Sequence, residues 1–136
     1  MSRCGMTRKE AREQAFFLIF EKSFREEEIN EIIATAQEAR EFEEDEYIKS
    51  TVAGVFENIE DIDNIISNNI SGWKINRLSK VSLALLRLAI YEMKYNDQIP
   101  VNVAINEAVE LCKKFATPDD AAYINGVLGA VAKGLS

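Results

Sequence analysis

Hydrophobic residues recur at steps of three or four along most of the chain, which is the period of an α-helix. Sustained alternation of polar and apolar residues, the sign of a half-buried β-strand, is absent from the sequence. The connections between the helical segments are short, which favours antiparallel neighbours. The pattern therefore predicts an all-α protein, a compact bundle of six to seven helices.

The first half of the chain predicts three helices. Residues 7–10 have the form of a capping box, so the first helix should run from about residue 8 to residue 24. Residues 28–41 carry a narrower apolar face and predict a shorter, more exposed helix. Apolar side chains then fall at helical spacing from residue 47 to residue 70, which predicts one long helix facing the core.

The second half predicts a turn over residues 73–78 and then three helices. Residues 81–93 are apolar around almost the whole circumference, so this helix should lie at the centre of the bundle. Pro100 interrupts the pattern, and Asn102 is the expected N-cap of the next helix. Pro118 fits the first position of a last helix.

Composition limits the possible classes of protein. The chain has 136 residues, of which 47% are hydrophobic and 29% charged, which suits one globular domain over residues 1–136 with a flexible lead at 1–6. No apolar run approaches the roughly 20 residues of a membrane span, and the start resembles no secretory or lipoprotein leader. We therefore expect a cytoplasmic protein with no membrane partner.

Residue counts also exclude several kinds of site. The chain has no His and two Cys, at positions 4 and 112, of which the second falls in an apolar helical stripe. A catalytic triad or a zinc site built on imidazole or thiolate groups is therefore excluded. No set of acid, base, nucleophile and metal ligands converges, so we expect no enzyme activity, no cofactor and no metal.

Charge is distributed unevenly along the chain. The formal net charge is −7, yet residues 1–12 carry four basic residues and one acidic residue. Residues 21–63 hold most of the acidic side chains, including two acidic runs. Because charges act over a Debye length of roughly 8–10 Å, an anionic partner would respond to the local basic surface rather than to the total charge.

The basic start of the chain is the first candidate site. Arginine binds phosphates through two hydrogen bonds, and basic termini commonly bind nucleic acid. The alternative is a solvated surface on which Glu10 and Glu13 pair with the cations. The four candidate cations are Arg3, Arg8, Lys9 and Arg12.

Three other candidates, two single residues and one pair, have two possible interpretations each. The ring of Tyr123 could stack on an RNA base or pack along the bundle. Arg87 lies within the apolar helix, so it needs either an ion-pair partner or a route to water. Glu107 and Glu110 have the spacing of an acid and base pair, but a solvated or salt-bridged helix face explains them better.

Three segments closely resemble the NusB transcription antitermination family. They are residues 87–93, residues 99–111 with the run Val-Ala-Ile-Asn-Glu-Ala-Val-Glu, and residues 123–128. Residues 8–13 are similar to the arginine-rich first helix of that family, and residues 52–55 to its third helix. The resemblance covers essentially the whole chain after Met6.

The resemblance implies a fold of two small helical bundles and a function in transcription. It implies binding to the box A element of nascent ribosomal RNA, together with the ribosomal protein that acts as NusE. With other Nus factors and RNA polymerase, such a complex suppresses premature termination. The family also includes homodimers in which the RNA-binding surface is partly covered.

The resemblance also assigns roles by position. Arg8, Lys9 and Arg12 would contact RNA, with Arg3 as a weaker candidate, and Asp119 and Tyr123 would lie near it. Ser82 and Arg87 would belong to the protein-partner surface. The chain departs from the family at Glu10, where many members have Arg, at Ser82, where an acidic residue is common, and at Ala122, where a basic residue is usual.

An interaction protein without RNA binding is the alternative function. In that hypothesis the molecule is a helical protein-protein interaction adaptor, and its basic tip is incidental. Box A RNA would then bind no better than a scrambled oligonucleotide at physiological salt.

Overall fold

A computed structural model describes residues 6–23, 33, 35, 45–70 and 74–135. These residues form six α-helices and one short 3-10 helix and contain no strand, so the all-α prediction is confirmed. The elements are α1 (Arg8–Lys22), α3 (Glu46–Glu57), α4 (Ile59–Asn69), η1 (Ile75–Arg77), α5 (Lys80–Tyr95), α6 (Val101–Phe115) and α7 (Pro118–Leu135). Of the helix expected over 28–41, the description covers only Ile33 and Thr35, both helical.

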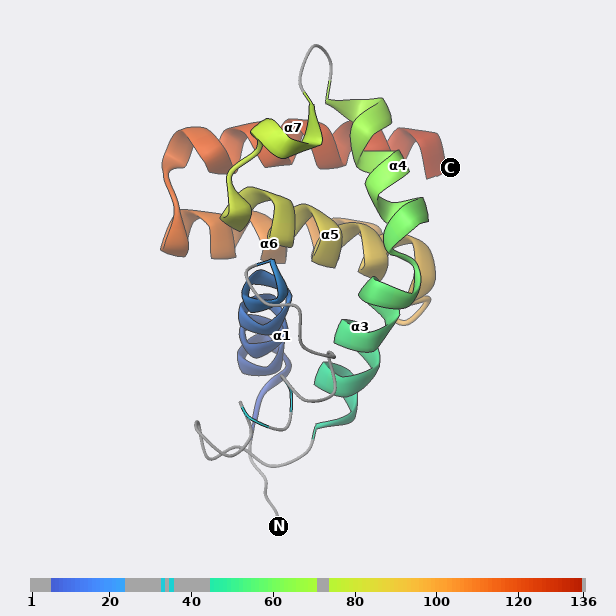
Figure 1. Ribbon diagram of the computed structural model, residues 1–136, viewed down its shortest axis with the longest axis vertical. Helices are drawn as coiled ribbons and strands as arrows, with labels where there is room; N and C mark the ends of the chain where they lie inside the picture. The colour runs from blue at the N-terminus through green and yellow to red at the C-terminus, as the bar shows by residue number, and fades with distance from the viewer. Residues whose placement is uncertain (1–5, 24–32, 34, 36–44, 71–73, 136) are drawn as a thin grey trace.

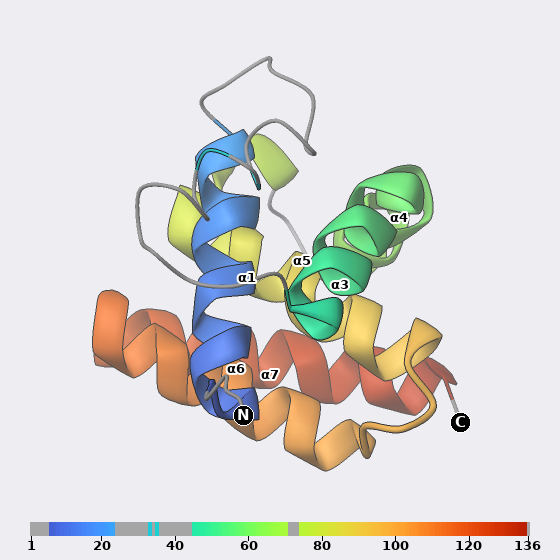
Figure 2. The ribbon, with the colours of Figure 1, turned by 90° about the horizontal axis from the view of Figure 1, so that it is seen from below.

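Helix α5 lies at the centre of the molecule, as its all-round apolar pattern predicts. It packs against α1, α3, α4, α6 and α7. Figure 1 shows α5, α6 and α7 running across the upper part of the view, with α1 and α3 below them. Seen from below in Figure 2, α1 and α3 lie side by side, which agrees with the packing between these two helices. Helix α1 is therefore held between α3 and α5.

The prediction of one long helix over residues 47–70 is wrong, because the helix is interrupted at Asn58 and forms α3 and α4. The Asn58 side-chain amide donates to the Gly54 carbonyl oxygen at 2.8 Å, and the Asn58 backbone N–H donates to the same oxygen at 3.1 Å. Asparagine side chains compete for backbone groups in this way and interrupt helices. The apolar stripe nevertheless faces the core, since Val55 and Ile62 on either side of the break are fully buried.

The start of α6 also differs from the prediction. Pro100 is the N-cap, Val101 is the first helical residue, and Asn102 is an exposed residue in the first turn. The Pro100 carbonyl oxygen accepts the Val103 and Ala104 N–H groups at 3.0 and 3.1 Å, and no side chain caps the helix. Pro118 does begin α7, as predicted.

Cys112 is fully buried in the core on α6, as its place in the apolar stripe predicts. Burial, with a smaller contribution from the charge of Asp120, raises the pKa of the Cys112 thiol to about 11. The residue therefore acts as a small apolar side chain. Cys4 lies outside the described residues.

Among the described helices, none combines the length and the apolar character that crossing a membrane requires.

Candidate nucleic-acid interface

The first turn of α1 is fixed by its own residues. The Thr7 hydroxyl accepts the Glu10 backbone N–H at 3.1 Å, and the Glu10 carboxylate accepts the Thr7 backbone N–H at 3.0 Å. The backbone hydrogen bond from Thr7 holds the pKa of the Glu10 carboxyl below its ordinary value. The capping box predicted from sequence is confirmed, and it places Arg8 and Lys9 on the exposed first turn.

Arg12 lies in a buried cluster rather than on the surface. Its Nε donates to Glu92 Oε1 at 3.1 Å, and its Nη2 donates to Glu92 Oε2 at 3.2 Å. The Tyr47 hydroxyl donates to the same Oε2 atom at 2.7 Å. The Arg12 and Glu92 side chains are 5% and 1% exposed. This cluster joins α1, α3 and α5 at one point of the core.

The buried cluster changes the role expected for Arg12. Burial by itself would lower the pKa of Arg12, but its hydrogen bond and attraction to Glu92 outweigh this effect and raise the pKa. Removing one partner from such a pair leaves an uncompensated buried charge, which costs several kcal/mol. In this fold the Arg12 guanidinium is an internal structural group. Its burial leaves little surface for RNA, and the expected direct contact stays a prediction.

Arg8 lies over the outer face of the same cluster. Its guanidinium carbon is 4.3 Å from the centre of the Tyr47 ring, while the side chain stays exposed. Among the described residues Arg8 has no carboxylate partner. A guanidinium over an aromatic ring gains a cation–π attraction and keeps its N–H groups free to donate. Arg8 is therefore well placed to meet an external anion.

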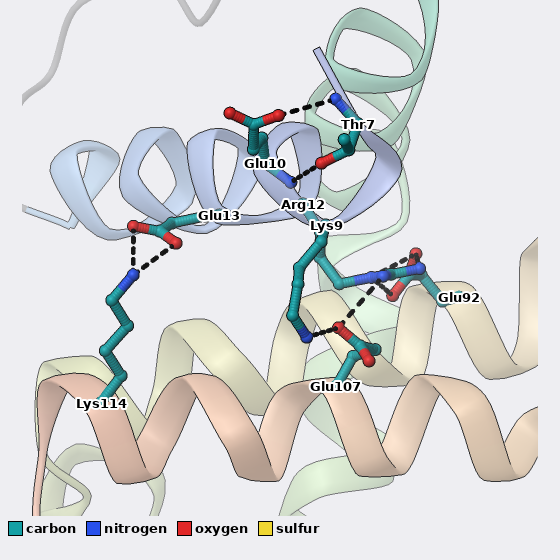
Figure 3. Close-up of polar contacts among 8 residues, drawn as sticks. All are labelled: Thr7, Lys9, Glu10, Arg12, Glu13, Glu92, Glu107 and Lys114. Carbon is teal, nitrogen blue, oxygen red and sulfur yellow. Dashed lines mark hydrogen bonds and ion pairs between the residues drawn. The ribbon is translucent and has the colours of Figure 1, made fainter.

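Two exposed ion pairs link α1 to α6. Lys9 Nζ lies 3.1 Å from Glu107 Oε1, and Lys114 Nζ lies 3.0 Å from Glu13 Oε2. Figure 3 shows both ion pairs crossing between the two helices, with Arg12 reaching the same Glu107. The Lys9 side chain remains 69% exposed. Such exposed pairs contribute little stability, so an incoming phosphate can compete for Lys9.

Two shallow hollows of about 360 and 370 Å³ flank the Lys9–Glu107 pair. The first is lined by charged residues of α1 and α6, including Lys113 and Lys114. The second is lined by Arg8, the segment 98–100 and Val103, whose side chain is exposed. Cations therefore stand at the rims of both hollows, and the second also offers apolar surface. No group of three or more Cys, Asp or Glu side chains in the described ranges is arranged to hold a metal ion.

The remaining two RNA candidates lie on α7. Asp119 is exposed in the first turn of α7. Tyr123 is half-buried against the core, and its hydroxyl is enclosed without a hydrogen-bond partner. We find no hydrogen bond or ion pair, in the part of the chain that is described, that joins either residue to α1. The packing interpretation of Tyr123 thus accounts for its ring, and its RNA contact remains an expectation.

The two residues expected at a protein-partner surface are also constrained. Ser82 is 3% exposed within α5, so its side chain presents almost no surface. Arg87 forms two hydrogen bonds with Asp63 on α4, at 2.9 and 2.8 Å. Asp63 is therefore the ion-pair partner that a charged residue on an apolar helix requires. Arg3, the remaining candidate, lies outside the described residues.

Sequence reasoning missed the residues that organise this site. Tyr47, Glu92 and Lys114 were not candidates, and Glu107 was considered only as part of a solvated or salt-bridged face. A signal existed for Glu92, because it is a charged residue in an almost wholly apolar helix and therefore needs a buried partner. No comparable signal identified Tyr47.

Comparisons with known proteins agree with the resemblance in the sequence. A family model described as the NusB family matches residues 9–133. The chain is 49% identical to the transcription antitermination protein NusB of Acetivibrio thermocellus, covering 94% of this chain and 90% of that protein. It is 45% identical to the protein of the same name from Ruminiclostridium cellulolyticum, over 95% of this chain and 90% of that protein.

Solved structures show the same fold. A structure of T. maritima NusB matches with a TM-score of 0.88 and 32% identity, covering 96% of this chain and 93% of that one. A crystal structure of the antitermination factors NusB and NusE in complex with dsRNA matches with a TM-score of 0.85 and 31% identity. That match covers 93% of this chain and 96% of the other.

Proposed function

Because the chain belongs to the NusB family, we propose that it is a transcription antitermination factor that binds RNA with a NusE-type ribosomal protein. Its RNA target is the box A element of nascent ribosomal RNA, and it acts in the cytoplasm without catalysing a reaction. Other Nus factors and RNA polymerase are its indirect partners. The observation that carries the proposal is the exposed pair of cations, Arg8 and Lys9, on the first turn of α1.

The proposed contact surface consists of Arg8 and Lys9, extended along α6 by Lys113 and Lys114. The Lys113 and Lys114 side chains are each 59% exposed, and their ion pairs are weak surface pairs. Arg3 would add a cation from the start of the chain, and Asp119 and Tyr123 would border the RNA. Arg87 is the better candidate for the partner surface, since the side chain of Ser82, the other candidate, is buried within α5.

A few cations of this kind predict modest and salt-dependent affinity for RNA alone. Each phosphate contact on a single strand contributes about −0.7 to the slope of log K against log salt concentration. Specificity comes from unstacked bases and from a second protein that shares the RNA. The NusE-type partner should therefore strengthen binding to box A more than binding to other sequences.

Two double variants test the proposal. Arg8→Ala with Lys9→Ala should weaken box A binding and reduce the salt slope by about 1.4, while circular dichroism and thermal unfolding stay unchanged. The matched control is Lys74→Ala with Arg77→Ala, which removes the same charge from exposed positions around η1. Fluorescence anisotropy with box A and scrambled RNA, with and without the NusE-type protein, measures the effect.

The outcomes separate the two functions. Loss of binding only in the α1 variant supports the RNA-binding function. Unchanged affinity in that variant, or equal affinity of the wild type for box A and scrambled RNA, refutes it and favours the adaptor.

We also propose that the free protein forms a homodimer that covers part of the α1 surface. Val103 and Phe115 are exposed apolar residues on α6 near the proposed RNA contacts, and a second copy would bury them. Sedimentation velocity with increasing box A RNA should then show dimers giving way to protein–RNA complexes. A monomer at all protein concentrations would contradict this.

A further inference from the structure

The second residue of α3, Tyr47, contacts both of the arginines on the first two turns of α1. Its ring centre is 4.3 Å from the Arg8 guanidinium carbon and 5.7 Å from that of Arg12. Tyr47 itself is only 8% exposed, so the ring has little freedom to move away. One face of a rigid ring thus lies under an exposed arginine.

The opposite end of Tyr47 is fixed in the core. Its hydroxyl donates to Glu92 Oε2 at 2.7 Å, and Glu92 is held in turn by Arg12. The Asp45 carboxylate caps α3 by accepting the Ile48 N–H at 3.0 Å, which fixes the backbone beside the ring. The position of the ring is therefore determined by two charged groups and a helix cap.

An arginine on a free first turn has many rotamers, and ordering them costs affinity when an anion binds. A fixed ring under the guanidinium restricts those rotamers before binding. The guanidinium edge still carries N–H donors for a phosphate.

We propose that Tyr47 is a positioning residue for RNA binding, which holds Arg8 in place through its ring while Glu92 and Arg12 hold the ring. The inference rests on the proposed RNA-binding function. It assigns to the buried cluster a role in affinity as well as in stability.

Replacing the ring and removing the hydroxyl should have different effects. Tyr47→Leu removes the ring and should weaken box A binding by about two- to fivefold, the range of an exposed cation–π contact. Tyr47→Phe keeps the buried ring and should lose clearly less affinity than Tyr47→Leu, although it loses the hydrogen bond to Glu92 and unfolds at lower urea concentration. The larger loss of RNA affinity should therefore follow the loss of the ring, whereas the loss of the hydroxyl alone should mainly lower stability.

A double-variant cycle tests whether Tyr47 acts through Arg8. In an Arg8→Ala background, Tyr47→Leu should cause no further loss of affinity. The matched control is Tyr95→Leu, because Tyr95 also pairs its ring with a cation, Lys94, and its hydroxyl with a carboxylate, Asp61. That variant should leave RNA binding unchanged.

Anisotropy titrations and urea unfolding of the same samples decide the question. If Tyr47→Phe loses as much affinity as Tyr47→Leu, or if Tyr47→Leu still acts without Arg8, the positioning role is overturned. The same follows if Arg8→Ala weakens binding and Tyr47→Leu does not. If Arg8→Ala together with Lys9→Ala leaves box A binding unchanged, the proposed function itself fails.

Discussion

Two clusters in this molecule have nearly the same composition and opposite surroundings. Arg12, Glu92 and Tyr47 form one, in which a carboxylate accepts hydrogen bonds from a cation and from a tyrosine hydroxyl. Lys94, Asp61 and Tyr95 repeat that arrangement between α4 and α5. The cation and carboxylate side chains are 5% and 1% exposed in the first cluster, and 36% and 43% exposed in the second.

The comparison shows that burial decides what such a group of residues can do. Water and salt screen the exposed cluster, so its charges can exchange partners at little cost. The buried cluster has no competing solvent, so its charges are held to one another. On α1 this difference divides two arginines one helical turn apart, with Arg8 exposed to anions and Arg12 internal.

The largest effect is expected from breaking the buried cluster. Glu92→Ala leaves the Arg12 guanidinium buried without its carboxylate and should lower the free energy of unfolding by about 3–5 kcal/mol. Urea unfolding followed by circular dichroism measures this. Asp61→Ala is the matched control in the exposed cluster, and equal losses in the two variants would contradict the comparison.

An intermediate effect is expected at the half-buried pair between α4 and α5. The Arg87 and Asp63 side chains are 16% and 30% exposed, and two hydrogen bonds join them. Asp63→Ala should cost about 1.5–3 kcal/mol of unfolding free energy, the range for hydrogen bonds to charged groups. The loss of unfolding free energy in Asp63→Ala should lie between the losses in Asp61→Ala and Glu92→Ala. A loss outside that range would show that the exposure of an ion pair does not set its contribution to stability.

A smaller, salt-sensitive effect is expected at the exposed cluster. Asp61→Ala should cost no more than about 1 kcal/mol at low salt, and the difference from wild type should vanish at about 1 M salt, where the Debye length is roughly 3 Å. Urea unfolding at two salt concentrations measures it. A loss that persists at high salt would mean that Asp61 acts through packing.

The smallest effect concerns alkaline pH. Burial, followed by the charge and hydrogen bond of Glu92, raises the pKa of Tyr47 well above its ordinary value of 10.0. The unfolded state therefore loses this proton first, and the stability from the Tyr47 hydroxyl is complete well below pH 10 and declines as the pH approaches and passes 10. The stability difference between wild type and Tyr47→Phe should shrink by about 0.4 kcal/mol between pH about 8 and about 10. A difference that grows with pH would contradict the sign.

Local signals in the sequence predicted much of the fold correctly. The capping box at Thr7 and the proline at position 118 fix helix starts through neighbours within one turn. The all-round apolar character of α5 predicted its central place, and Arg87 within it predicted an ion pair without revealing its partner. The break at Asn58 was missed because the same apolar spacing continues across it.

The sequence by itself determined the helical class, the core-facing stripes and a basic first turn, because these depend on residues a few positions apart. Only the tertiary structure decided which cations remain exposed. Arg12 meets Glu92 across 80 positions, and Tyr47 meets Glu92 across 45. The free energy of a charge depends on the solvent and the partners around it, and both are set by helices that come together only in the fold.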